Sequence, residues 1–188
     1  MLNLTLLLIS LLLSIQKINI ERESFPFSVE LITADGKKIN SSILTNDNKV
    51  VLIDFWHSGC SPCMQMFDAV RDNIEEWNKE TNCKIIAITC QERDEKIIQL
   101  IESKKWPVEV YFDPNYTLFK VLSQFHDKRD MQFSFPTVFV FNEKWQLIDK
   151  LKGTKRKFNP QKEVKSYEDF EIDLDYYYNL SKNWENNK

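Results

Sequence analysis

Two cysteines separated by two residues are the side chains of this sequence best suited to covalent chemistry. Cys60 and Cys63 lie in the run Trp-His-Ser-Gly-Cys-Ser-Pro-Cys, which spans residues 56–63. If a helix begins at the first cysteine, unpaired backbone N–H groups and the helix dipole stabilise its thiolate. The second cysteine, one turn further on, can then attack a mixed disulfide formed by the first. The spacing therefore predicts a nucleophile at Cys60 and a resolving thiol at Cys63.

A pair of cysteines at this spacing can also be half of a zinc site. Such sites use a second CxxC pair, or a pair of histidines at a fixed spacing. The sequence has 4 cysteines and 2 histidines, and no second pair of this kind occurs among them. The redox interpretation is therefore favoured, and no metal is expected.

The apolar pattern around the motif predicts the elements that position the two cysteines. Val50 to Phe55 is a short apolar run with β-branched residues, typical of a strand buried on both faces of a sheet. After the motif, apolar residues recur at helical spacing in a segment that reaches about Thr81. These residues are Met66, Phe67, Val70, Ile74 and Trp77. The motif thus joins a central strand to a helix.

The rest of the chain alternates strand and helix patterns and indicates a single α/β domain. Alternating residues from Phe27 to Ile32, followed by a turn at Asp35-Gly36, predict a small hairpin that ends at Ile39. Further strands are expected at residues 84–89, 108–112, 137–141 and 147–151, helices at 95–103, 116–122 and about 167–183, and an irregular segment at 123–134. No repeat or linker divides the 188 residues, which suffice for one substantial core.

The first 20 residues form a separate segment. Leu2 to Ile15 is almost wholly apolar, and charged residues follow from Lys17. The run is shorter than the roughly 20 residues of a membrane-spanning helix, so a secretory signal peptide is predicted, with a retained N-terminal anchor as the alternative. The folded domain is then expected over residues 25–188. A periplasmic or other extracytoplasmic location suits a dithiol, because disulfides form in oxidising compartments.

The charge balance argues against a nucleic-acid partner. The formal net charge is -3 at pH 7, so the chain has no global basic field that would attract a phosphate backbone. A basic run from Lys150 to Lys157 precedes an acidic stretch from Glu168 to Asp175. Both are interpreted as solvated surface.

The active-site segment resembles that of the thioredoxin superfamily. The matching residues are Val51 to Trp56, followed by Cys60-Ser61-Pro62-Cys63. The hairpin upstream, the turn at Phe112-Asp113-Pro114 and the Phe135-Pro136-Thr137 run are similar to those of TlpA/ResA-type exported thioredoxins.

The likeness covers about Phe25 to Gly153 and implies a thioredoxin-like three-layer fold. In that fold a mixed central sheet is flanked by helices, and this type adds an N-terminal β-hairpin and a strand-helix insertion. A C-terminal helical extension, at about residues 160–188, is not matched by the resemblance.

The resemblance also implies roles for residues beyond the cysteines. Pro136 is expected to be a cis-proline that faces the active site, with Phe135 presenting its backbone to an extended substrate. Trp56 is expected to pack beside the dithiol and to contribute to substrate binding. Asp54 is the implied buried acid that assists Cys63. Its place inside an apolar strand independently predicts a raised pKa.

Two further residues are candidate modulators of the site. Cys90 ends a strand predicted to run parallel to the central strand, hence at the sheet edge that carries the motif, although a buried structural cysteine is the alternative. It cannot pair with Cys83, because seven steps along one strand separate the two by about 23 Å. His57, three residues before Cys60, either tunes the thiolate or faces solvent.

Together these observations predict an enzyme that reduces disulfides in exported, cysteine-containing polypeptides. As the resemblance implies, a membrane-bound dithiol donor would supply its electrons, and its only redox group would be the Cys60–Cys63 disulfide. The Ser61-Pro62 pair is closer to the reducing members of the superfamily. A protein disulfide oxidase or isomerase and a thioredoxin-like copper carrier are the alternatives. A peroxide-reducing enzyme is disfavoured because a Thr-x-x-Cys context is absent around Cys60.

Overall fold

A seven-stranded mixed sheet with the order β2-β1-β5-β4-β3-β6-β7 forms the centre of the protein. The computed structural model describes residues 28–126, 134–157 and 171–185. The strands of the sheet are β1 (Glu30–Thr33), β2 (Lys38–Asn40), β3 (Val50–Trp56), β4 (Cys83–Thr89), β5 (Glu109–Phe112), β6 (Thr137–Phe141) and β7 (Leu147–Lys152). The described helices are the short 3-10 helix η1 (Ser41–Ile43) and the α-helices α2 (Ser61–Asp72), α3 (Ile74–Glu80), α4 (Glu95–Lys104), α5 (Thr117–His126) and α6 (Leu174–Glu185).

Strand β3 is the central strand, and its side chains are buried along its whole length. It pairs in parallel with β4, where Val50 lies opposite Cys83 and Trp56 opposite Thr89. On its other side it pairs antiparallel with β6. A strand with neighbours on both edges and helices over both faces needs apolar side chains throughout, which explains the apolar run in the sequence. Its C-terminal end leads directly into the CxxC motif.

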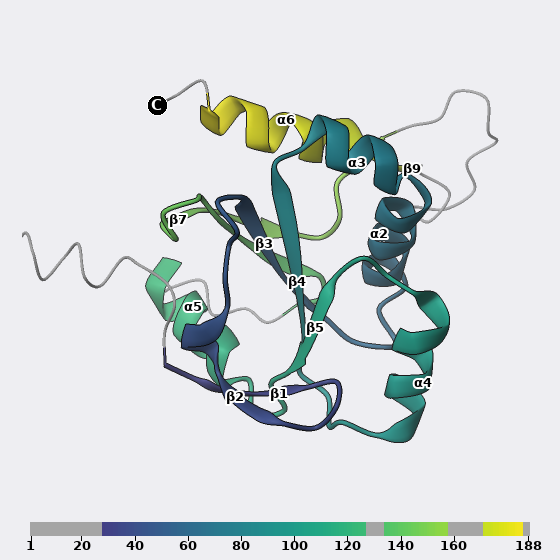
Figure 1. Ribbon diagram of the computed structural model, residues 1–188, viewed down its shortest axis with the longest axis vertical. Coiled ribbons are helices and arrows are strands. Elements are labelled where there is room, and N and C mark those ends of the chain that lie inside the picture. The colour runs from purple at the N-terminus through teal and green to yellow at the C-terminus, as the bar shows by residue number, and fades with distance from the viewer. Residues whose placement is uncertain (1–27, 127–133, 158–170, 186–188) are drawn as a thin grey trace, which may run out of the picture.

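Alternate residues of β3 belong to two separate hydrophobic cores. Leu52 and Trp56 pack with residues of α2, α3 and α6 on one face, whereas Ile53 and Phe55 pack with α5 on the other. Figure 1 shows α5 on one side of the sheet and α2 with α4 on the opposite side. The three-layer α/β fold expected from the sequence is therefore confirmed.

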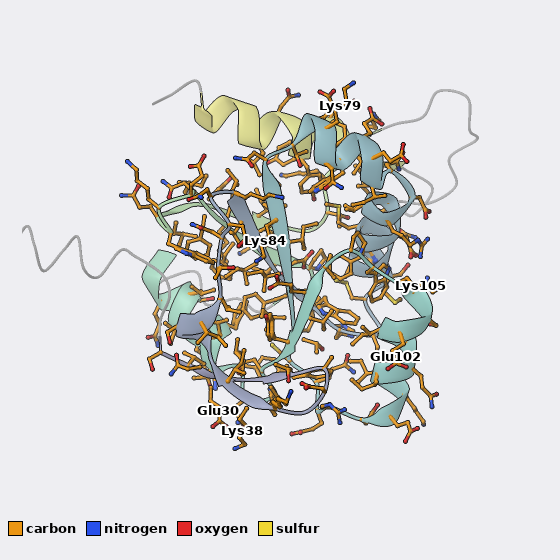
Figure 2. All side chains as sticks on the ribbon, in the orientation of Figure 1. Glu30, Lys38, Lys79, Lys84, Glu102 and Lys105 are labelled. Atoms are coloured by element: carbon orange, nitrogen blue, oxygen red, sulfur yellow. A yellow bond between two sulfur atoms is a disulfide. The ribbon has the colours of Figure 1, made fainter. Side chains whose placement is uncertain are left out.

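The N-terminal hairpin joins the sheet through β1, which pairs with β2 and with β5. Its turn contains Gly36 with φ of 88°, a left-handed conformation that glycine adopts without steric cost. Figure 2 shows Glu30 and Lys38 at this outer edge, where their side chains form an ion pair of 2.9 Å. The hairpin and the β5–α5 unit correspond to the predicted hairpin and strand-helix insertion.

The long helix predicted after the motif is divided in two at Asn73. The backbone of Asn73 leaves the helical region at φ −122° and ψ 30°. Its side-chain amide donates to the carbonyl oxygen of Ala69 at 2.8 Å, and its backbone N–H donates to the same oxygen at 3.2 Å. An asparagine side chain that bonds nearby backbone competes with helix continuation, so the single-helix prediction is wrong at this residue.

Two helix boundaries and one small sheet also differ from the sequence prediction. Helix α5 continues to His126, so the first residues expected to be irregular are helical, with Leu122 and Ser123 fully buried. Helix α6 begins at Leu174, later than expected, and the Asp173 carboxylate accepts the Tyr176 N–H at 3.2 Å. Before it, β8 (Arg156–Lys157) and β9 (Glu171–Ile172) form a two-stranded sheet that was not predicted. The predicted signal segment at residues 1–20 and the predicted start of the C-terminal extension, at residues 160–170, lie outside the described residues.

Candidate active site

The two cysteines of the motif form a disulfide at the N-terminus of α2, with their Cα atoms 5.3 Å apart. Cys60 is the N-cap residue, and its Sγ accepts the backbone N–H of Cys63 at 3.2 Å. Cys60 is 5% exposed, whereas Cys63 is fully buried. The helix N-terminus therefore stabilises negative charge on the more accessible of the two sulfur atoms.

The turn before Cys60 is held in place by hydrogen bonds at both its ends. The Cys60 N–H donates to the carbonyl oxygen of His57 at 2.9 Å. The Ser58 N–H donates to the side-chain oxygen of Gln91 at 2.6 Å, and the Gln91 amide donates to the Ser58 hydroxyl at 3.1 Å. Gln91 follows β4, so the end of the neighbouring strand fixes the CxxC turn. No sequence pattern pointed to Gln91.

Phe135 and Pro136 lie beside this turn. The Phe135–Pro136 peptide bond is cis, which confirms that expectation. The ring centroids of Phe135 and His57 are 4.5 Å apart in an edge-to-face contact. The carbonyl oxygen of Pro136 accepts the Gly153 N–H at 2.9 Å, which ties the loop to the end of β7. The structure thus brings the loop that precedes β6 to the nucleophile, as the sequence predicted.

Asp54 is buried in the middle of the sheet, two residues before the end of β3. It is 3% exposed, and its strand neighbours are Ala87 on β4 and Val138 on β6. Its Oδ1 atom has no hydrogen-bond partner within the described part of the chain. Burial raises the pKa of the Asp54 carboxyl well above its ordinary value of 3.8. By strand alternation the side chain lies on the same face as Trp56, the face on which α2 places Cys63.

Trp56 is fully buried and makes edge-to-face contacts with Phe67 and Trp106, at centroid distances of 5.8 and 5.4 Å. It belongs to the same hydrophobic core as Cys60 and Cys63, in keeping with the expected packing beside the dithiol, and it has no exposed surface with which to touch a substrate. A contribution to substrate binding would have to act through the residues above it.

Cys90 lies at the sheet edge that carries the motif but on the opposite face from Cys63. It belongs to the core under α5, and Cys63 belongs to the core under α2 and α3. Burial raises the pKa of the Cys90 thiol, and the nearby Asp113 carboxylate raises it further. Cys83, at the other end of β4, is likewise buried and lies outside the disulfide. In the structure Cys90 has the environment of a structural cysteine rather than of a reactive one.

Tyr177 on α6 is a site residue that sequence reasoning missed. It is 1% exposed, its ring packs against Trp77 of α3, and its hydroxyl accepts the Lys155 N–H at 3.2 Å. Burial raises the pKa of Tyr177, and the negative charge of Asp54 raises it further, so the two side chains lie within electrostatic range. The three consecutive tyrosines at residues 176–178 indicated an aromatic contact in this segment, but the sequence does not determine which of the three faces the core.

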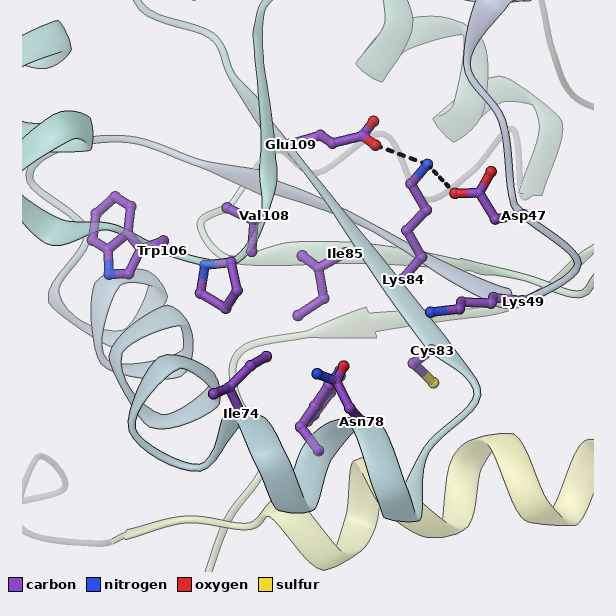
Figure 3. Close-up of a pocket in the computed structure, with 12 residues that line it drawn as sticks. Asp47, Lys49, Ile74, Asn78, Cys83, Lys84, Ile85, Trp106, Val108 and Glu109 are labelled. Carbon is purple, nitrogen blue, oxygen red and sulfur yellow. Dashed lines mark hydrogen bonds and ion pairs between the residues drawn. The ribbon is translucent and has the colours of Figure 1, made fainter.

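A pocket of about 400 Å³ lies at the opposite end of the sheet from the disulfide, between α3 and the starts of β4 and β5. Figure 3 shows Lys84 there, between the carboxylates of Asp47 and Glu109 at 2.8 and 2.9 Å. Cys83 and Trp106 also line it, and the Trp106 ring is the one that packs on Trp56. The pocket is thus separated from the Cys60–Cys63 disulfide by the length of the central strands.

Within residues 28–126, 134–157 and 171–185, no group of three or more His, Cys, Asp and Glu residues is placed to hold a metal ion. None of the helices in the same ranges combines the length and the apolar composition of a membrane span.

The fold and the disulfide at the start of α2 define a protein of the thioredoxin superfamily with a CxxC disulfide. The chain belongs to the AhpC/TSA family, whose family model matches residues 22–150. The resemblance to TlpA/ResA-like proteins is therefore confirmed, and fold and family together support oxidoreductase chemistry in general. No curated protein sequence matches the chain significantly.

Solved structures with the same fold come from several bacteria. A thioredoxin-like protein from Porphyromonas gingivalis is 26% identical, with a TM-score of 0.50 over 66% of this chain and 78% of that one. A domain of a possible thiol-disulfide isomerase from Cytophaga hutchinsonii is 19% identical, with a TM-score of 0.56 over 88% of this chain and 95% of that one. A thiol:disulfide interchange protein of the thioredoxin family from Chlorobium tepidum is 18% identical, with a TM-score of 0.51 over 69% and 82%.

Proposed function

We propose that the protein reduces disulfides in exported, cysteine-containing polypeptides by dithiol–disulfide exchange. The observation that carries the proposal is the placement of Cys60, which is the more exposed residue of the pair and whose sulfur accepts a backbone N–H at the start of α2. This is the environment in which a thiolate forms at neutral pH and attacks a disulfide.

The exchange proceeds in two steps that conserve atoms and electrons. In the reduced protein the Cys60 thiolate attacks one sulfur of the substrate disulfide, that S–S bond breaks, and the first substrate thiolate leaves and takes a proton from water. The Cys63 thiol then loses its proton and attacks Cys60 Sγ, which releases the second substrate thiolate. Two electrons pass to the substrate, and the protein is left with the Cys60–Cys63 disulfide seen in the structure.

Asp54 is the group proposed to take the proton from Cys63. A general base works best when its pKa lies near the working pH, and burial raises the pKa of Asp54 in that direction. The carboxyl lies on the sheet face that α2 covers, so no strand separates it from the resolving cysteine.

The loop at Phe135 is proposed to bind the substrate through its backbone. Pairing with an extended peptide reads main-chain groups rather than side chains, so the enzyme would accept many unfolded polypeptides. A membrane-bound dithiol donor is proposed to return the protein to its reduced form. Export is proposed from the apolar run at residues 2–15, with residues 1–20 as signal peptide or anchor.

The test is reduction of insulin disulfides by the reduced protein, with Cys60→Ser and Cys63→Ser as matched controls that each remove one sulfur. Wild-type protein is expected to catalyse the reaction and both variants to lose turnover. A titration against glutathione then gives the reduction potential, which separates a reductase from an oxidase or isomerase. A wild-type protein that leaves insulin unchanged but binds copper through both cysteines would support the carrier function and contradict the proposal.

A further inference from the structure

We propose that His57 is a positioning residue that holds the turn before Cys60 against the loop at Phe135 and so fixes the distance between Cys60 and that loop for polypeptide substrates. This inference deepens the proposed function and rests on it. It gives His57 a role in binding the substrate chain rather than in tuning the thiolate.

The first contact of the His57 ring is within its own turn. Its Nδ1 atom accepts the backbone N–H of Gly59 at 3.0 Å, while its carbonyl oxygen accepts the Cys60 N–H at 2.9 Å. The side chain and the backbone of one residue thus bond two successive N–H groups immediately before the nucleophile. The ring is therefore held over the turn instead of turning freely in solvent.

The second observation is the space above Gly59. A Cβ atom at this position would lie 3.0 Å from Cε1 and 3.2 Å from Nδ1 of His57, which is closer than ordinary van der Waals contact. The backbone of Gly59 is not in the left-handed region, so its conformation alone does not require glycine. The imidazole ring therefore occupies the place beside Cys60 where a side chain at residue 59 would begin.

The third contact joins the turn to the substrate loop. The rings of His57 and Phe135 meet edge to face, with centroids 4.5 Å apart and an interplanar angle of 71°. Each of the two loops also has an anchor of its own, Gln91 for the turn and Gly153 for the loop. His57 is thus a bridge that sets the distance between two separately anchored loops.

The consequence is specific to substrates that use both loops. A polypeptide must place its disulfide at Cys60 and its backbone along Phe135 at once, so a fixed distance between the two reduces the ordering that binding requires. A small disulfide without a peptide backbone needs Cys60 alone. The sulfur of Cys60 is stabilised by the Cys63 N–H rather than by His57, so its intrinsic reactivity does not depend on the bridge.

The experiment separates the two contacts with three substitutions. His57→Phe keeps a ring for Phe135 but removes the acceptor, His57→Asn keeps an acceptor two residues before Gly59 but removes the ring, and His57→Ala removes both. Steady-state kinetics are measured with insulin and with hydroxyethyl disulfide, and a thermal melt verifies that each variant folds.

For insulin, KM is expected to rise roughly threefold to tenfold in His57→Phe and His57→Asn, because each loses one hydrogen bond or one aromatic contact. In His57→Ala, which loses both, KM is expected to rise further. The kcat of all three variants is expected to stay within about twofold of wild type. For hydroxyethyl disulfide, the rate constant and the reduction potential are expected to remain those of wild type.

Gly59→Ala provides an independent control that leaves His57 in the sequence. The new methyl group would lie 3.0 Å from Cε1 of His57, so the ring must shift by a few tenths of an ångström and the variant is expected to show a raised KM, no larger than that of His57→Ala. The double variant His57→Ala with Gly59→Ala is expected to be no worse than His57→Ala, because both substitutions act on the same contacts.

The inference is overturned if His57→Ala reduces insulin with the KM of wild type, or if its reactivity towards both disulfides falls by the same factor, which would assign His57 to the thiolate. A failure of the proposed function looks different. In that case the wild-type protein itself does not reduce insulin, whatever residue stands at position 57.

Discussion

The two sulfur atoms of the CxxC motif differ in environment although only two residues separate them. Cys60 is 5% exposed and its Sγ accepts an N–H from the first turn of α2, whereas Cys63 is completely buried. This asymmetry supports the proposal that Cys60 attacks the substrate and Cys63 resolves the mixed disulfide. The same helix provides both, because one turn brings the second cysteine under the first.

Replacing the resolving cysteine is expected to trap the substrate. In Cys63→Ser the Cys60 thiolate still attacks, but no second thiolate releases the mixed disulfide. Turnover should be abolished while covalent complexes accumulate, detected as thiol-sensitive bands on a non-reducing gel. Cys60→Ser is the matched control and should form no complexes. If Cys60→Ser captured more substrate than Cys63→Ser, the roles of the two cysteines would be reversed.

Asp54→Asn is expected to slow the reaction and to stabilise the fold. The amide cannot take the proton of Cys63, so resolution should slow by about 10²-fold, the usual contribution of a general base. Burying an unpaired polar group costs about 1–3 kcal/mol, and the cost is greatest for the ionised form. The lifetime of the mixed disulfide measures the slower resolution, and the midpoint of urea unfolding measures the gain in stability.

The stability gain from Asp54→Asn should grow with pH. The folded-state pKa is raised, so above the ordinary value of 3.8 the unfolded chain loses its proton first and the folded state binds more protons. Wild-type stability then falls as pH rises, until the pH passes the folded-state pKa. The variant lacks this titration, so the two midpoints should converge towards pH 4. If the two urea midpoints differed by the same amount at all pH values, a raised pKa of Asp54 in the folded state would be contradicted.

Asp113 provides a contrasting buried carboxyl at the same sheet edge. It accepts the backbone N–H groups of Thr117 and Leu118 at 2.9 and 2.8 Å, at the start of α5. Asp113→Ala should therefore destabilise the protein by about 1 kcal/mol, the usual cost of losing a helix cap. Opposite signs for Asp54→Asn and Asp113→Ala in urea unfolding would show that hydrogen bonding, rather than burial alone, decides the effect of each acid.

Among the elements, α6 has the least expected role. It lies beyond residue 150, where the family match ends, yet it places Tyr177 in the same core as Cys63 and Trp56. Its tyrosines pack on Trp77, so α6 covers α3 and the upper part of this core, as Figure 1 shows. The C-terminal extension is thus part of the enclosure that keeps Asp54 away from water.

Substitutions at Tyr177 should separate its ring from its hydroxyl. Tyr177→Ala is expected to cost about 3–5 kcal/mol, as for other large aromatic residues in a core, and to lower the pKa of Asp54 by admitting water. Tyr177→Phe loses only the bond from Lys155 and should cost about 1 kcal/mol. Tyr176→Phe, half-buried on the same helix, is the control and should change stability by less than about 0.5 kcal/mol. Chemical unfolding measures the stabilities, and the pH profile of mixed-disulfide resolution reports the pKa of Asp54.

At the scale of the whole molecule, the disulfide and the pocket around Lys84 lie at opposite ends of the sheet. The disulfide follows the C-terminal end of β3, while the pocket around Lys84 lies where β4 and β5 begin. The aromatic stack of Trp56, Phe67 and Trp106 fills the interior between them. Substrate is therefore expected to approach from the CxxC edge alone.

A chain that begins at Phe25 is expected to fold as the full chain does. Residues 1–20 are predicted to serve export rather than folding, so their removal should leave the core of the domain intact. The thermal midpoint of this shorter chain should lie within about 2 °C of that of the full chain, less than a change of 1 kcal/mol would cause. A lower midpoint would show that residues 1–24 pack on the domain.

The sequence by itself determined the central strand, the start of the helix after it and the spacing on which the proposed roles of the two cysteines rest, because each depends on apolar periodicity or on spacing within a few residues. It also placed Phe135 and Pro136 in the site, through a resemblance rather than through any local pattern. Where a side chain competes with the backbone, as at Asn73, local periodicity was misleading.

Only the tertiary structure decided which distant residues meet at the disulfide. It placed Cys90 on the opposite face from Cys63, Tyr177 within range of Asp54, and the ring of His57 against Phe135. These relations join residues far apart in the chain, and they depend on strand order and on how each helix crosses the sheet. No periodicity in the sequence encodes them, because they arise only when separate elements pack against one another.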